Sequence, residues 1–454
     1  MSSTARVPAF VIAIALGNLL VPLNSTMIVV ALPLIARDLG ADPAASAWLI
    51  TSYLIAMAAV QPIAGRLGDR FGRRRLMLGA LAYFIVASIG GALAPSLLVL
   101  VLFRLQQALA AAAVVPNGLA LLRGSAVAGR AGMFFGIAGA MTGIGAAVGP
   151  LLGGLLAAID WRLIFLVNIP LAGTALLLGW RSIEDARPER PAARPDVIGA
   201  IGMGVLLSLA AWILTGAGRG VDGTTVLLGV VTLVAATAFI RYELRHPDPA
   251  LPPRFFTVRA FAGANVTIAF ANVALYGSLI GVPILLAGGA EASVRAGIAL
   301  SALSAALIVG SPVSGLLADR LGARWPTALG GLLITVGLLV PVLSGRPDDY
   351  LVLLVGLPIA GAGVALTFPA TRIAAMDAVP ARHAALASGV TSSSRYFGGM
   401  VGSLVAVAAL ARPGGGGTLL FGILAAAGVA TAAVGFVLPP AVVSPSDPVP
   451  AAGG

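Results

Sequence analysis

The chain has 454 residues, of which 59% are hydrophobic and only 10% are charged, and its formal net charge is +11. Soluble domains average about a quarter charged residues, so this composition excludes an ordinary water-soluble protein. The chain has no Cys, which excludes disulfides and thiolate metal sites, and no Lys, which excludes a P-loop ATPase domain.

Apolar runs of about 20 residues recur from end to end, which is the length that a helix needs to cross a bilayer. They predict an all-α polytopic membrane protein with 14 transmembrane helices. The first run is too long for the core of a signal peptide, so we expect it to remain as a span. The predicted spans are 8–35, 47–65, 76–95, 97–121, 132–158, 163–180, 197–217, 224–241, 260–286, 296–317, 326–344, 350–371, 384–410 and 417–439.

Arg residues are distributed unevenly over the loops between these spans. With the N-terminus inside, 20 Arg fall in cytoplasmic segments and 6 in outer loops, while Arg104 and Arg395 lie inside spans. Basic loops stay on the cytoplasmic side, so this distribution predicts a protein of the bacterial cytoplasmic membrane with both termini cytoplasmic. The basic excess follows from this topology and does not indicate a nucleic-acid partner.

An internal repeat divides the chain. The segments GRLGDRFGRR (65–74) and GLLADRLGAR (315–324) agree at six of ten positions and lie 250 residues apart, each at the cytoplasmic end of a span. Two related halves are a common plan for transporters. The predicted parts are a six-helix bundle (1–181), a linker with two extra helices (182–259), a second six-helix bundle (260–440) and a disordered cytoplasmic tail (441–454), which gives spans arranged as 6 + 2 + 6.

The first copy of this repeat is the most specific signal in the chain. Gly65 and Gly72 allow a sharp connection between the second and third spans, and Asp69 can accept hydrogen bonds from a neighbouring helix N-terminus. The segment resembles the signature loop between spans 2 and 3 of the major facilitator superfamily. The resemblance implies the major facilitator fold and a cytoplasmic gate, in which the Asp stabilises the outward-facing state through contacts across the two halves. The implied gate residues are Gly65, Asp69, Arg70, Gly72, Arg73 and Arg74, with Asp319 and Arg320 in the second copy.

Arg104 lies inside the fourth predicted span, where a guanidinium costs about 2.5–3.5 kcal/mol on insertion scales. It is expected either to act in transport or to snorkel to the interface. The segment LFRLQQALAAAAVVPNG (102–118) resembles the superfamily's span-4 motif, whose Arg is linked to proton transfer. Arg104 and Gln107 match that motif, while Ala108 stands where it usually has Gly.

The fifth predicted span carries Gly145, Gly149 and Gly153 on one face, a spacing that lets another helix approach closely. Together with Pro150 and Gly154 they form the pattern GxxxGPxxGG, which resembles the superfamily's antiporter signature and implies export.

Two further segments narrow the resemblance. LNSTMIVVALP (23–33) and DWRLIFLVNIP (160–170) resemble the fourteen-helix drug:proton antiporter branch of the superfamily. That branch commonly carries an Asp in span 1, where this chain has Asn24, and an amide does not titrate.

All 17 acidic residues lie in loops or near the ends of the predicted spans. The candidates for a proton relay are Arg104, Asp38 and Asp69. The alternatives are a substrate that itself carries charge or protons, and a transporter that is uncoupled or uses a different ion.

Uncharged polar side chains inside the spans are candidates for lining a substrate cavity among apolar walls. They are Asn24, Thr26, Gln107, Asn117, Asn272 and Tyr276. With no carboxylate predicted to be buried, neutral or anionic organic molecules are favoured over cationic ones.

These observations predict a secondary active exporter of small organic molecules, as in drug or metabolite efflux, driven by proton antiport through alternating access. Uptake and a non-transporting membrane sensor are the alternatives. An enzyme is not expected, because the sequence offers no nucleophile with a base and no metal ligands inside the spans. We expect a monomer that interacts with its organic substrate, protons and membrane lipid, with no catalytic residue, no metal, no cofactor and no nucleic-acid partner.

Overall fold

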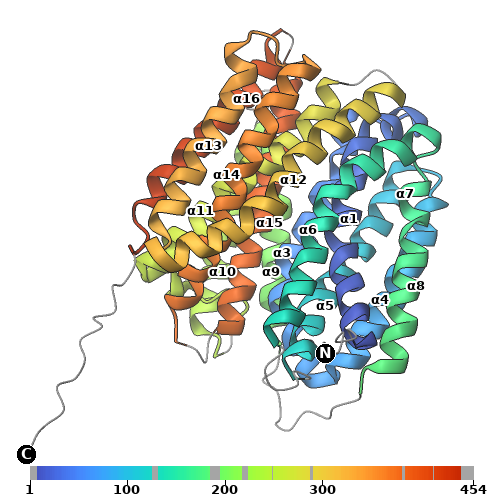
Figure 1. Ribbon diagram of the computed structural model, residues 1–454, viewed down its shortest axis with the longest axis vertical. Coiled ribbons are helices and arrows are strands. Elements are labelled where there is room, and N and C mark those ends of the chain that lie inside the picture. Colours follow the sequence, from blue (N-terminus) through green and yellow to red (C-terminus); the bar gives the residue numbers. More distant parts are fainter. Residues whose placement is uncertain are drawn as a thin grey trace, which may run out of the picture.

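The computed structural model describes residues 8–124, 131–184, 195–216, 223–247, 249–286, 290–380, 384–412 and 414–440. Apart from one isolated bridge between Gly322 and Pro440, the regular structure of these residues is helical. The predicted all-α class is therefore confirmed. Most helices run roughly along the long axis of the molecule (Figure 1).

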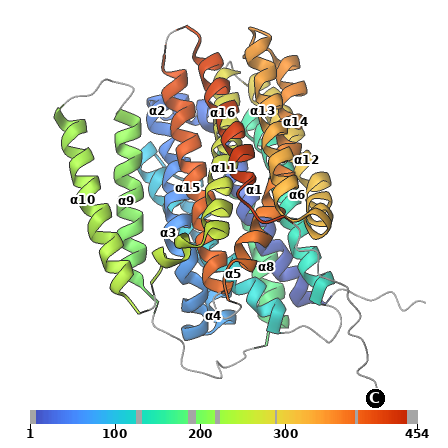
Figure 2. The same ribbon diagram turned by 90° about the vertical axis from the view of Figure 1, so that its left-hand side faces the viewer.

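The chain forms two helical bundles joined by a helix pair. The first bundle contains α1 (Ala9–Asp38), α2 (Pro43–Ser46), α3 (Trp48–Phe71), α4 (Arg73–Ala92), α5 (Leu97–Gly124), α6 (Ala131–Ile159), α7 (Leu163–Leu166) and α8 (Asn168–Ser182). The helix pair is α9 (Val197–Gly216) and α10 (Gly223–Arg245), followed by the short 3-10 helix η2 (Pro253–Thr257). The second bundle contains α11 (Arg259–Leu285), α12 (Ala290–Leu321), α13 (Arg324–Leu343), α14 (Tyr350–Asp377), α15 (Ala384–Leu410) and α16 (Gly416–Gly435). Figure 2 shows α9 and α10 standing at one side of the molecule, beside α3 and α15.

Twelve of the described helices are long and apolar enough to cross a membrane, which confirms the membrane character that composition predicts. The two predicted spans that fall outside this set are α9 and α15. The apolar stretch of α9 is short, Val197–Ile213, and α15 carries the polar run TSSSR (391–395). The count of fourteen spans stays a prediction.

The gate motif is mostly helical, which differs from the loop that the sequence suggested. The predicted second span ends at residue 65, whereas α3 continues to Phe71 and leaves only Gly72 as the connection to α4. Gly72 has a φ of 94°, which favours glycine, and its N–H donates to Gly68 O (2.9 Å). The predicted turn role is therefore correct for Gly72 and wrong for Gly65, which lies within the helix.

The second copy of the repeat ends its helix in the same way. Gly322 follows α12, has a φ of 74°, and donates its N–H to Ala318 O (2.9 Å). The internal repeat of the sequence thus corresponds to the same helix ending in both bundles. We call this end of the molecule the arginine-rich end, because Arg66 and Arg70 lie at the end of α3 and Arg73, Arg74 and Arg75 at the start of α4.

The two bundles meet along the helix pairs α6–α12 and α3–α15, with α1 also contacting α11. Hydroxyl groups bridge these pairs: Ser393 Oγ donates to Ala58 O (2.7 Å), and the Thr51 and Ser403 hydroxyls lie 3.2 Å apart. Between α6 and α12, Leu151 N donates to Ser301 Oγ (3.0 Å). Polar contacts of this kind hold membrane helices together, because water does not compete for them there.

Candidate functional site

A chain of hydrogen-bonded polar side chains runs through the interior of the first bundle. Arg104 donates through Nη1 to Gln107 Oε1 (2.9 Å), and Gln107 donates to Ser88 Oγ (2.9 Å). Asn24 donates to Gln107 Oε1 (3.5 Å) and accepts from Asn168 Nδ2 (3.0 Å). All five side chains are buried and none is acidic. The structure thus brings three predicted site residues, Asn24, Arg104 and Gln107, into one network.

Arg104 contacts no carboxylate among the described side chains. Its Nε donates to Leu49 O (3.3 Å), its guanidinium carbon lies 4.6 Å from the centre of the Tyr53 ring, and its Nη2 is buried without a hydrogen-bond partner. The residue is only 1% exposed, so the alternative in which it snorkels to the interface is wrong. A buried guanidinium without a counter-ion is costly, which indicates a role beyond packing.

A second polar group lies where the two bundles meet. Arg395 on α15 donates through Nη2 to Tyr396 OH (2.8 Å), and both lie within electrostatic range of Tyr53. The Tyr276 ring packs on the α15 backbone, where a Cβ added to Gly399 would approach it to 2.9 Å. Of these residues, sequence reasoning singled out only Tyr276 as a site candidate. Arg395 lies in the middle of a predicted span, and this position was the sequence feature that could have indicated a functional site here.

Two further side chains that were predicted to line a substrate cavity make hydrogen bonds within their own bundles. Asn272 is fully buried, and its Nδ2 donates to Ile268 O (2.8 Å) within α11. Thr26 donates to Pro22 O (2.8 Å) and lies against Gly149 of α6.

Asp69, Arg73 and Arg74 of the gate motif, at the arginine-rich end, make their hydrogen bonds within the first bundle. Asp69 accepts from Arg73 Nε (2.7 Å), and both side chains are 41% exposed. Arg73 also donates to Ala120 O (3.4 Å), and Arg74 donates to Trp180 O (2.9 Å). These bonds connect α4 to α3, α5 and α8.

Asn117 lies beneath this motif. Its Nδ2 donates to Ala64 O (3.1 Å) and Ala113 O (2.8 Å), and its Oδ1 occupies the space where a Cβ at Gly68 would collide. In the second copy of the motif Arg320 is exposed, and the side chain of Asp319 lies outside the described residues.

Asp38 is bound at the opposite end of the first bundle. Its Oδ2 accepts from Trp161 Nε1 (2.9 Å) and from Arg162 Nη1 (3.1 Å). The guanidinium carbon of Arg162 also lies 4.4 Å from the Trp161 ring centre. Asp38 therefore fastens the end of α1 to the segment before α7.

The glycine stripe of α6 lies between two helices. A Cβ at Gly145 or Gly153 would lie 2.5 Å from a backbone oxygen of α1, at Leu19 or Met27 respectively. Gly154 instead faces α12, where a Cβ would lie 2.6 Å from Ser293 O. On the same side, the Pro150 oxygen lies 2.6 Å from a Cβ added to Gly297. The stripe thus lets α6 approach both α1 and the second bundle.

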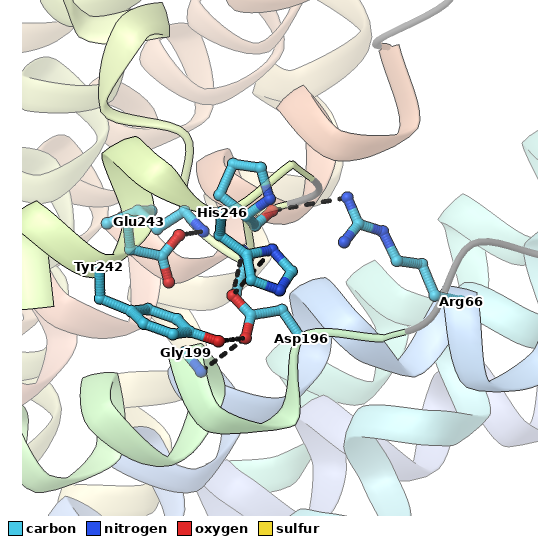
Figure 3. A network of polar contacts seen from close by, with 9 residues as sticks. Arg66, Asp196, Gly199, Tyr242, Glu243 and His246 are labelled. Carbon is cyan, nitrogen blue, oxygen red and sulfur yellow. Dashed lines mark hydrogen bonds and ion pairs between the residues drawn. The ribbon is translucent and has the colours of Figure 1, made fainter.

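A buried acidic network, which sequence reasoning missed, lies at the base of α9 and α10 (Figure 3). Asp196 Oδ1 accepts from Gly199 N (2.8 Å) and Tyr242 OH (2.8 Å), and Oδ2 accepts from Ala250 N (3.1 Å). Asp196 is 3% exposed and Glu243 only 1%, so the expectation that no carboxylate is buried is wrong. Asp196 precedes an apolar run, and the N-cap role of Asp at such a position was the available signal.

The same network continues from the helix pair to the gate motif. Glu243 Oε2 accepts from Leu251 N (2.9 Å), and the His246 Nδ1 atom lies 4.0 Å from Asp196 Oδ2. Pro249 O accepts from Arg66 Nη2 at 3.5 Å. The segment after α10 is thereby fixed both to α9 and to the end of α3.

We expect Asp196→Ala to loosen the base of the helix pair. The change leaves the Tyr242 hydroxyl and the N–H groups of Gly199 and Ala250 without their acceptor, and each buried unpaired donor costs about 1–3 kcal/mol. Amide hydrogen exchange of Gly199 and Ala250 should accelerate roughly tenfold or more. Asp196→Asn, which keeps one acceptor oxygen, should give a smaller change, and equal exchange in all three proteins would contradict this account.

Comparison with known proteins matches the family model described as Major Facilitator Superfamily to residues 14–403 and 264–453. Multidrug resistance protein Stp of Mycobacterium tuberculosis is 35% identical over 409 residues, which cover 88% of this chain and 75% of that protein. The Tetracenomycin C resistance and export protein of Streptomyces glaucescens is 31% identical over 87% of this chain and 74% of its own length. The Puromycin resistance protein pur8 of Streptomyces alboniger is 34% identical over 86% of this chain and 79% of its own length.

Solved structures of similar shape support the fold. A POT family transporter in complex with 5-aminolevulinic acid superposes with a TM-score of 0.69 at 15% identity, covering 94% of both chains. The peptide transporter POT in complex with sulfate gives a TM-score of 0.66 at 16% identity, covering 96% of this chain and 94% of that one. Since the family model spans most of the chain and the helices adopt the corresponding arrangement, this protein belongs to the Major Facilitator Superfamily.

Proposed function

We propose that this transporter exports small organic molecules, as in drug or metabolite efflux, by alternating access of its two bundles. The observation that carries the proposal is that relatives sharing 31–35% identity over nearly nine tenths of the chain are named for drug resistance or export. The α6 glycine stripe, which resembles an antiporter signature, supports the same direction of transport.

The proposed membrane arrangement has fourteen spans, as six helices, two extra helices and six helices. The described helices supply two bundles with α9 and α10 between them in sequence, and we assign the bundles to 1–181 and 260–440 with the linker at 182–259. We place the arginine-rich end in the cytoplasm, because basic segments are retained there. Both termini then lie on the cytoplasmic side of a bacterial cytoplasmic membrane.

We propose proton antiport as the source of energy, although the central network contains amides where a carboxyl group would be expected. Asn24 connects Gln107 to Asn168 and cannot carry the proton. Arg104, Asp38 and Asp69 remain the candidates for the relay.

The test is flux in reconstituted vesicles carrying a pH gradient. We expect radiolabelled tetracenomycin C to accumulate in vesicles that contain the protein, in the direction opposite to proton flow. Collapse of the gradient with a protonophore should abolish the accumulation. Accumulation that survives the protonophore would contradict proton coupling, and flux no greater than that of empty vesicles would contradict export of this compound.

A further inference from the structure

Four polar side chains from both bundles lie within electrostatic range of Tyr53 of α3. They are Arg104 of α5, Tyr276 of α11, and Arg395 and Tyr396 of α15. Each guanidinium lies over a phenol ring: Arg104 is 4.6 Å from the centre of Tyr53, and Arg395 is 4.7 Å from the centre of Tyr396. We call these five residues the Arg–Tyr cluster; the first bundle contributes Tyr53 of α3 and Arg104 of α5, and Ser25 of α1 lies next to Tyr276.

Two members of the cluster are only half-buried. Arg395 and Tyr276 each lie near the middle of a helix of the second bundle, within electrostatic range of Tyr53 in the first bundle, and keep part of their surface exposed. Part of each side chain is therefore open to contact with a ligand. Next to them, Arg104 Nη2 and Tyr53 OH are buried without a hydrogen-bond partner. Buried polar groups normally have a partner, so these two atoms point to a ligand that supplies one.

The charge of the cluster is positive and uncompensated. Among the described carboxyl groups only Asp196 and Glu243 are buried, and they lie at the base of α9 and α10 instead. Arg372 on α14 lies within electrostatic range of Arg395 and adds a third positive charge. A site with several guanidinium groups and no carboxylate favours an anion and repels a cation.

We propose that the Arg–Tyr cluster binds an organic anion with an aromatic body. The half-buried Arg395 takes the carboxylate, sulfonate or phenolate group, Arg104 supplies a further positive charge, and the Tyr276 and Tyr396 rings contact the aromatic part. This assignment rests on the proposed function, since it names the substrate class that the exporter recognises. It also explains why the buried Arg104 and the half-buried Arg395 have no acidic partner among the described side chains.

Binding to the purified protein in detergent, without any gradient, tests this inference separately from transport. The probe is radiolabelled 1-naphthaleneacetate, with unlabelled 2-(1-naphthyl)ethanol and 2-(1-naphthyl)ethylamine as neutral and cationic competitors of similar shape. We expect saturable binding of the anion and competition at least tenfold weaker by the alcohol and the amine, because charge-assisted hydrogen bonds supply most of the difference.

Two variants locate the site. Arg395→Gln should weaken binding of 1-naphthaleneacetate roughly tenfold to a hundredfold, and Arg395→Lys should weaken it less. Arg259→Gln removes an exposed Arg at the start of α11 and should leave binding unchanged. Tyr276→Phe keeps the aromatic ring that contacts the ligand, so this variant should retain most of the affinity.

The outcomes separate this inference from the proposed function. Amine binding as tight as anion binding, or an Arg395→Gln variant that is folded and binds like the parent, would overturn the anion site. Competition by inorganic phosphate as strong as by the naphthalene anion would also overturn it, because the aromatic contact would then contribute nothing. Anion binding without flux in vesicles would contradict export and leave the binding site intact.

Discussion

Replacement of Arg104 by Gln is expected to reduce substrate flux at least a hundredfold while leaving a folded protein in the membrane. Arg104 is the charged member of the network that includes Gln107 and Asn24, and its Nη2 has no partner in this state. Loss of the charge removes the group that an anion or a moving proton would meet at the centre of the molecule. A hundredfold loss corresponds to about 2.8 kcal/mol, which is within the range of a single charge-assisted contact.

The stability of the Arg104→Gln variant should change little, because no buried carboxylate loses its partner. Breaking a buried ion pair costs about 3–5 kcal/mol, whereas here only Leu49 O and Gln107 Oε1 lose a donor. Thermal unfolding in detergent and flux in vesicles measure the two effects side by side. Arg412→Gln, which removes an exposed Arg, is the matched control. Full flux in the Arg104 variant would refute its role in transport.

The helices were predictable from sequence because a bilayer sets their length and composition. The predicted end of the second span at residue 65 was wrong, because Gly65 and Gly68 weaken a helix without ending it, and α3 continues to Phe71 and ends only at Gly72. The repeat also predicted that the two segments share a local structure, and Gly72 and Gly322 do end their helices with positive φ. Span length and helix ends were therefore predictable where they depend on residues close together in the sequence.

The partners of the polar residues were not predictable, because they depend on tertiary contacts. Asn24 meets Asn168, which lies 144 residues away, and no spacing rule connects them. Likewise Asn117 lies under Gly68 rather than in an open cavity, which only the packing of α5 against α3 reveals. The burial of Asp196 arises in the same way, from the fold of the segment after α10 over its carboxylate.

Asp69→Asn, in the gate motif, is expected to reduce substrate flux at least tenfold. In this structure Asp69 pairs with Arg73 in its own bundle, and both side chains are 41% exposed. Exposed ion pairs contribute about 0–1 kcal/mol, so loss of the contact seen here would not by itself account for a tenfold loss of flux. We propose that Asp69 acts in the outward-facing state, where it contacts the second bundle.

The change therefore acts on the equilibrium between states and not on folding. If Asp69 stabilises the outward-facing state by about 1.4 kcal/mol, its loss lowers the population of that state tenfold when it is the minor state. Thermal stability should differ from the parent protein by less than about 1 kcal/mol, since only an exposed pair is lost. The chain has no Cys, so a Cys pair placed across the bundles at the arginine-rich end reports closure by crosslinking, and the Asn variant should crosslink less. Asp377→Asn, at the exposed end of α14, is the control. Equal crosslinking in the Asp69 and Asp377 variants would show that the gate does not depend on this carboxylate.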